Sequence, residues 1–176
     1  MIKKKKKYGI DQIISRRKAL TASGKGKSAT WTRVSSEEQF KSNNSIDTQL
    51  EACHRYCENN NKEVKYDFGG TFESAKKAGD KFLEMIGIVL NDPEIDTIVV
   101  YDYDRFSRNM TEGLTYKGQL NRSGITIIAV NQPVDKSNLL AEHIEAILLI
   151  VADIDNAMRR HKCYEGMVAC INRGEW

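Results

Sequence analysis

Two clusters of polar residues combine hydroxyl, guanidinium and carboxylate groups at close spacing. The first contains Arg33, Ser35, Ser36 and Gln39 after a short apolar run, and the second occupies residues 102–108. Transfer of a phosphoryl group to a serine requires an exposed hydroxyl, guanidinium groups that hold phosphate oxygens as charge develops, and a group that moves protons. Arginine suits the second role because its planar fork binds two oxygens at once and stays charged when partly desolvated. The two clusters together contain all of these groups.

Local spacing predicts how these side chains point. Alternation along a strand places Arg33 and Ser35 on one face and turns Ser36 to the other. Arg105 and Arg108 are three residues apart and share a face if a helical turn begins there. Each cluster also has a purely structural interpretation, as a helix cap by Ser35 or Ser36 and as a surface turn with salt bridges. The residues alone leave both interpretations open.

The elements that must position these clusters alternate along the chain from about residue 28. Strands that alternate with helices of this length form a mostly parallel sheet with helices on both faces, so the predicted class is α/β. Active sites of such sheets lie at the carboxyl ends of the strands, where both polar clusters fall. The pattern predicts strands at about 28–34, 63–68, 96–101 and 125–130, and helices at about 46–60, 81–91 and 110–123.

The segment from about 139 to 172 has the apolar periodicity of one long helix. At 1.5 Å per residue such a helix is about 50 Å long, which exceeds what a domain of this size covers with its own core. We therefore expect part of its apolar stripe to pack on another subunit; a two-part helix with a hidden break is the alternative. The stripe consists of Ile144, Ile147, Leu148, Val151, Ile154 and Met158.

The first 27 residues are strongly basic, although the net charge of the chain is only +3. They include Lys3 to Lys7, and Gly24 and Gly26 resemble a flexible joint. We expect residues 1–27 to be a disordered extension and residues 28–176 to be the folded domain. As an alternative to a solvated tail, the lysines form a phosphate-binding arm that adds nonspecific DNA affinity and nothing else. The remainder of the chain is acidic, so any DNA site within it must be a local basic cluster.

Composition is that of an ordinary globular protein. The 176 residues are 40% apolar and 29% charged, which suits one domain with a real core. No run of 18 apolar residues and no signal-peptide pattern occurs, so we expect no membrane association and a cytoplasmic location. We interpret the four cysteines as reduced core residues and predict no metal site, because the first pair is one helical turn apart within a periodic run. They are Cys53, Cys57, Cys163 and Cys170.

Several motifs resemble the resolvase/invertase family of serine recombinases. The opening signature is similar to Trp31-Thr-Arg-Val-Ser-Ser-Glu-Glu-Gln39 followed by Ser45-Ile-Asp-Thr-Gln-Leu50, and the second signature is similar to Tyr103-Asp-Arg-Phe-Ser-Arg108. Later segments agree in order and spacing, so the resemblance covers about residues 28–176. It implies the catalytic domain of a recombinase like those of bacterial mobile elements. The later segments are Gly124-Ile-Thr-Ile-Ile-Ala-Val130, Asp135-Lys-Ser137 and Gly174-Glu-Trp176.

The resemblance implies a transesterification on double-stranded DNA that needs no metal, ATP or other cofactor. Ser35 would attack a backbone phosphate, become joined to the 5′ end and release a 3′ hydroxyl. The family works as homodimers that assemble into tetramers, with the long carboxyl-terminal helix in the interface. Residue roles carry over by position: Arg33, Arg105 and Arg108 match the phosphate-binding arginines, Asp104 matches an acidic residue proposed to handle protons, and Gln39 and Gln49 match polar residues of the site.

The chain departs from the family pattern at two points. A further arginine of the family's site matches Gly79, with only Lys76, Lys77 and Lys81 nearby. Family members continue into a DNA-binding domain, whereas this sequence stops at Trp176, so we expect that domain to be absent.

The sequence has features that bear on two other functions. A catalytically weakened or truncated fragment that acts as a dimerising interaction module is favoured by Gly79 and the basic extension, and is disfavoured by an intact Ser35 with three arginines. An unrelated nucleotide-binding α/β protein is disfavoured because no glycine-rich phosphate loop follows the first strand.

Overall fold

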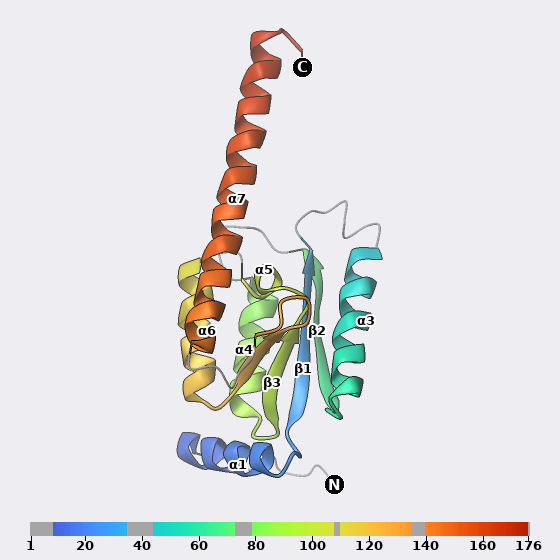
Figure 1. Ribbon diagram of the computed structural model, residues 1–176, viewed down its shortest axis with the longest axis vertical. Helices are drawn as coiled ribbons and strands as arrows, with labels where there is room; N and C mark the ends of the chain where they lie inside the picture. Colours follow the sequence, from blue (N-terminus) through green and yellow to red (C-terminus); the bar gives the residue numbers. More distant parts are fainter. Residues whose placement is uncertain (1–8, 35–43, 73–78, 108–109, 135–139, 176) are drawn as a thin grey trace.

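The core of the fold is a sheet of four parallel strands in the order β2-β1-β3-β4. A computed structural model describes residues 9–34, 44–72, 79–107, 110–134 and 140–175 (Figure 1). The alternating pattern therefore predicted the α/β class correctly. The strands are β1 (Lys27–Val34), β2 (Val64–Phe72), β3 (Ile95–Val100) and β4 (Thr126–Ala129); the helices are α1 (Ile10–Ala22), α3 (Asn44–Asn59), α4 (Asp80–Asn91), α5 (Tyr103–Phe106), α6 (Met110–Arg122) and α7 (Ala141–Asn172).

Helices cover both faces of this sheet, as predicted. Side chains of a strand alternate between faces, and in β3 Val99 packs in the cluster beneath α3, whereas Ile98 and Val100 belong to the larger cluster on the other face. Phe82 and Met85 of α4 lie in that larger cluster with Trp31 of β1. Two hydrophobic layers thus hold the sheet, and the helices leave the carboxyl ends of β1 and β3 at one edge.

The cysteines divide between the core and the long helix. Cys53 and Cys57 are free thiols on the buried side of α3, where they pack against Val99 of β3, and burial raises the pKa of Cys53 to about 12. The core interpretation is wrong for Cys163, which is exposed, and for Cys170, which is half-buried, because α7 has left the domain body where they occur. Within the described residues no cluster of three or more His, Cys, Asp or Glu side chains could hold a metal ion.

Helix α7 is one continuous helix of 32 residues, so the alternative of a hidden break is wrong. Its first turns pack on α5 and α6, and Leu149 is buried there. Lys117 of α6 and Glu145 of α7 form a nearly buried ion pair with an N–O distance of 2.9 Å. At 1.5 Å per residue the helix is about 48 Å long, and its second half projects away from the domain (Figure 1). None of the described helices has the length and apolar character needed to cross a membrane.

The prediction of a disordered extension is wrong for the segment that forms α1. This helix lies across the amino-terminal end of the sheet (Figure 1), and its Ile13 and Arg17 are buried. In sequence, Arg17 stands within a basic run that resembled a solvated surface, and only the tertiary contact shows otherwise. The expectation of a DNA-binding arm concerns above all Lys3 to Lys7, which lie outside the described residues.

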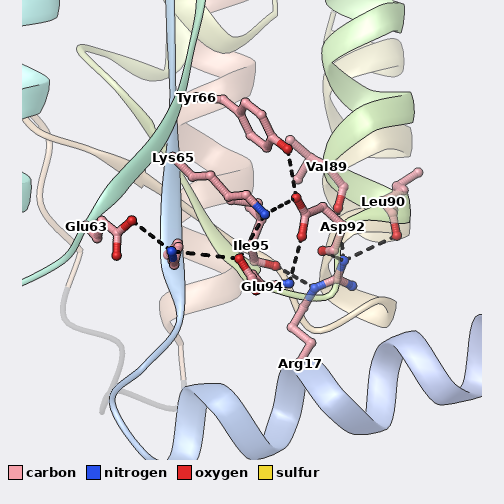
Figure 2. A network of polar contacts seen from close by, with 10 residues as sticks. Arg17, Glu63, Lys65, Tyr66, Val89, Leu90, Asp92, Glu94 and Ile95 are labelled. Carbon is pink, nitrogen blue, oxygen red and sulfur yellow. Dashed lines mark hydrogen bonds and ion pairs between the residues drawn. The ribbon is translucent and has the colours of Figure 1, made fainter. Parts of the chain in front are cut away.

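Arg17 joins α1 to the rest of the domain through five backbone carbonyl groups, and Figure 2 shows its contacts near the end of α4 and the start of β3. The last carbonyls of a helix have no intrahelical donor and carry partial negative charge. A buried cation that donates to them therefore supplies the missing hydrogen bonds and balances that charge. Burial lowers the pKa of Arg17, and the nearby Asp92 and Asp96 carboxylates oppose that shift. The guanidinium donates to the carbonyl oxygens of Val89 (2.9 Å) and Leu90 (3.2 Å) in the last turn of α4 and of Asp92 (2.8 Å) just after it. It also donates to the carbonyl oxygens of Ile95 (2.5 Å) at the start of β3 and Ser123 (2.5 Å) just after α6.

A group of ion pairs stabilises the same end of the sheet (Figure 2). Lys65 Nζ lies 2.6 Å from Asp92 and 2.9 Å from Glu94, and the Tyr66 hydroxyl donates to Asp92 at 3.0 Å. Asp92 also accepts the backbone N–H of Glu94 at 2.9 Å. The turn between α4 and β3 is therefore held from both β2 and α1.

We predict that Arg17→Met lowers the free energy of unfolding by about 3 kcal/mol, because five carbonyls lose a charged donor at once. Urea unfolding followed by circular dichroism measures the change. Lys18→Met is the matched control, since Lys18 is exposed on the same helix and its loss should stay within about 0.5 kcal/mol. Equal stability of the two variants would show that α1 is not an integral part of the domain.

Candidate active site

The two polar clusters meet at the carboxyl edge of the sheet. β1 and β3 are paired in parallel, with Trp31 opposite Val100, so their carboxyl ends are neighbours. β3 leads directly into the one-turn helix α5, which packs against β1. Within the described residues, Arg33 of the first cluster therefore meets Asp104 and Arg105 of the second.

Arg33 lies at the centre of this meeting point and is only 2% exposed. Its side chain donates to α5, from Nε to the carbonyl oxygen of Arg105 at 3.2 Å and from Nη2 to the carbonyl oxygen of Asp104. The backbone N–H of Arg33 donates to Oε1 of Gln49 at 3.3 Å. Gln49, which is 3% exposed, thus holds the end of β1 from α3. In this structure Arg33 faces protein carbonyls, and Gln49 supports the strand.

Asp104 and Arg105 form an ion pair on α5, with 3.6 Å between Oδ2 and Nη1. Each side chain is 22% exposed. Asp104 Oδ1 and Arg105 Nε are buried and have no hydrogen-bond partner within the described residues. Because buried polar atoms are nearly always paired, these two atoms have capacity for a further polar partner. With Arg33, the cluster brings two guanidinium groups together with the Asp104 carboxylate, and Arg105 Nε can donate to an anion.

Residues after β4 hold the start of α5, although they lie outside the two polar clusters that the sequence singled out. Asn131 donates to the Asp102 carboxylate at 3.1 Å, and Gln132 accepts the backbone N–H of Tyr103 at 3.1 Å. Burial and the nearby Asp104 carboxylate raise the pKa of Asp102, partly offset by the Asn131 hydrogen bond. The signal was available, because polar residues directly after the fourth strand must lie at the same edge of a parallel sheet.

A bulge in β2 shapes the sheet beside Arg33, and it too was missed. The register of β1 on β2 shifts between Thr32 and Arg33. Opposite this point Gly69 has φ +100°, and a Cβ atom there would come within 1.9 Å of the Thr32 carbonyl oxygen. The next residue, Gly70, donates its N–H to the Thr32 hydroxyl at 3.1 Å. Only glycine fits at position 69, and the paired glycines inside a strand pattern were the signal.

Not all of the predicted site residues can be placed. Ser35, Gln39 and Arg108 lie outside the described residues, as do Lys76 and Lys77. Gly79 is the amino-terminal cap of α4, with an ordinary extended backbone at φ −70° and ψ 159°.

The helical turn of the second cluster is short. Helix α5 ends at Phe106, and Ser107 is extended with φ −144° and ψ 148°. The turn that would place Arg105 and Arg108 on one face thus ends before residue 108, and Arg108 itself lies outside the described residues. A helix of four residues is too short to extend the i, i+3 relation that the spacing suggested.

Comparison with known proteins agrees with this geometry. The family described as the resolvase N-terminal domain matches residues 28–176. The chain belongs to the resolvase family. Its class of activity is accordingly DNA recombination by a serine recombinase catalytic domain. The match begins at residue 28, so α1 lies outside it although it packs into the same fold.

Three solved structures with this fold are recombinases. The amino-terminal catalytic domain of TP901-1 integrase has 25% identity and a TM-score of 0.58, over 75% of this chain and 98% of that one. A resolvase family site-specific recombinase from Streptococcus pneumoniae has 22% identity and a TM-score of 0.59, over 84% and 99%. The carboxyl-terminal catalytic domain of ISC1926 TnpA, an IS607-like serine recombinase, has 15% identity and a TM-score of 0.54, over 83% and 99%. A comparison with curated proteins finds no match.

Proposed function

We propose that this protein cleaves and rejoins double-stranded DNA with Ser35 as the nucleophile. The observation that supports this proposal most directly is the meeting of Arg33, Asp104 and Arg105 at the edge where β1 ends. Val34 is the last residue of β1, and Ser35 follows it in the sequence, two residues after Arg33. Because the substrate is DNA, we further propose a cytoplasmic location for the reaction.

The proposed step exchanges one phosphoester for another. The Ser35 oxygen forms a bond to phosphorus while the bond from phosphorus to the 3′ oxygen breaks, which leaves a 5′-phosphoserine and a 3′ hydroxyl. Arg105 and Arg108, with Arg33, balance charge on the phosphate oxygens. We assign the proton transfers to Asp104, whose Oδ1 has no partner within the described residues: its carboxylate accepts the proton of the Ser35 hydroxyl and then delivers it to the 3′ oxygen. Rejoining is the reverse attack by a 3′ hydroxyl, so no external energy or cofactor is needed.

The glutamines have different proposed roles. Gln49 supports the end of β1 through the backbone of Arg33, whereas Gln39 binds substrate near the nucleophile. The first role has a contact in the structure, and the second rests on the family resemblance alone.

The experiment that tests this function maps the covalent adduct. The chain is fused to a zinc-finger module, bound to a duplex that carries the module's site and a nick, and analysed by mass spectrometry. We expect a phosphoserine adduct at Ser35 that is absent from Ser35→Ala and present in Ser36→Ala, because the motif that resembles the family's opening signature places the nucleophile two residues after Arg33.

Other outcomes contradict the proposal in different ways. An adduct on Ser36, or one that persists in Ser35→Ala, overturns the assignment of the nucleophile. If no adduct forms while the protein still self-associates, the dimerising interaction module is the better function.

We also propose that Gly79 weakens the active site. The position lies at the amino-terminal end of α4, where the family resemblance expects an arginine. Absence of one preorganised donor typically lowers a rate by roughly a hundred- to a thousandfold. Nearby lysines supply charge but cannot reproduce the two-point contact of a guanidinium.

We predict that Gly79→Arg increases the single-turnover cleavage rate in the same tethered assay, measured at fixed DNA occupancy. The ordinary φ of residue 79 accommodates the side chain, although the loss of a glycine cap costs about 1 kcal/mol of stability. Gly79→Met is the matched control, because it adds similar bulk without charge and should not accelerate cleavage. An unchanged rate in Gly79→Arg, together with loss of cleavage in Lys76→Ala, Lys77→Ala or Lys81→Ala, would show that a lysine already fills the role.

For the partners of the protein, we propose that α7 forms a homodimer and that dimers form a tetramer. The exposed apolar side chains of α7 repeat at alternating spacings of three and four residues, which is the pattern of a helix seam between two chains. The second half of α7 projects beyond the domain body (Figure 1). The exposed members of the stripe are Ile144 (37% exposed), Ile147 (56%), Val151 (46%), Ile154 (51%) and Met158 (53%), whereas Leu148 packs against the domain core.

We predict that Ile154→Glu weakens dimerisation by about a hundredfold, since two apolar side chains worth roughly 1.5–3 kcal/mol each leave the interface. Sedimentation velocity over a range of protein concentrations measures the dissociation constant. Asn156→Glu is the control, because this position lies on the opposite side of the helix from the seam. If neither variant changes the dissociation constant, the stripe is not the interface.

A further inference from the structure

The one-turn helix α5 carries Asp104 and Arg105 but is too short to be stable alone. No side-chain hydrogen bond caps its amino-terminal end at Asp102. The last carbonyl groups of any helix lack an intrahelical donor, and in a helix of four residues these are most of the carbonyls. The position of Asp104 and Arg105 therefore depends on donors that other elements bring to α5.

Two side chains of β1 supply those donors. The indole Nε1 of Trp31 donates to the carbonyl oxygen of Arg105 at 2.9 Å, and Arg33, two residues along the same strand face, donates to the carbonyls of Arg105 and Asp104. Trp31 is completely buried, and its ring meets Phe82 edge to face with the centroids 5.5 Å apart. A buried indole N–H requires a partner, and its rigid ring places that partner accurately.

We propose that Trp31 is a positioning residue for DNA cleavage: its indole N–H holds the Arg105 carbonyl and thereby orients Asp104 and Arg105. It touches no DNA. The bond to Trp31 keeps α5 in place whether Arg33 donates to protein carbonyls or to a phosphate, so Arg33 can change partner without releasing the turn. This inference rests on the proposed function of the site.

The test removes the N–H and keeps the shape of the ring. In the full chain, Trp31 is replaced site-specifically by β-(3-benzothienyl)alanine, which has sulfur in place of the indole N–H. Trp31→Phe provides a second variant that lacks the donor. Val89→Ala is the control for stability, because Val89 is a buried core residue at the opposite end of α4. Single-turnover cleavage and DNA affinity are measured in the tethered assay, and amide hydrogen exchange of Arg105 and Ser107 is followed by NMR.

We expect the benzothienyl protein to cleave roughly 10- to 100-fold more slowly, because small displacements of reacting groups cost on the order of a hundredfold. Its DNA affinity should stay within about twofold of the unmodified chain, since the binding charges are intact. The amides of Arg105 and Ser107 should exchange faster. Val89→Ala should cleave at the unmodified rate at temperatures where it is folded, with unchanged exchange at those two amides.

Two results would overturn the inference. One is cleavage by the benzothienyl protein at the unmodified rate, and the other is unchanged amide exchange at Arg105 and Ser107. Failure of the proposed function has a different signature, because the unmodified chain would then form no adduct. In that case the exchange measurement still decides whether Trp31 holds α5.

Discussion

The parallel pairing of β1 with β3 is the contact on which the candidate active site depends. It brings the end of β1, with Arg33, beside the segment that leaves β3, with Asp104 and Arg105. The two clusters are about 70 residues apart in the chain, and a crossover through α3, β2 and α4 is needed to unite them. Hydrophobic layers on both faces stabilise this pairing, so mutations far from the site act on it through the core.

Unpaired carbonyl groups at helix ends are satisfied in the same way at both ends of the sheet. At the amino-terminal end, Arg17 donates to a carbonyl in the last turn of α4 and to one just after α6. At the carboxyl end, Trp31 and Arg33 donate to carbonyls of α5. In each case a buried side chain with fixed donors comes from an element remote in sequence. The first contact integrates a helix that lies outside the family match, and the second holds the turn that carries the site.

Helix α7, unlike these satisfied carbonyl groups, presents an apolar surface that the domain leaves uncovered. Glu145 and Leu149 are buried against the body, whereas Val151 and Ile154 are exposed. A nearly buried ion pair with Lys117 fixes where the helix departs. The proposed homodimer rests on this exposed stripe.

The sequence by itself determined the α/β class and, from residue 28 onward, the order of the elements apart from the one-turn helix α5, because periodicity and strand ends are local properties. It also determined the family, through motifs that span few residues. Only the tertiary structure decided that Arg17 is a buried anchor within a helix, that α5 ends before Arg108, and that Arg33 faces the carbonyls of Asp104 and Arg105. The physical reason is that a carbonyl's partner, or the burial of a charge, depends on elements far apart in the chain, which no local pattern records.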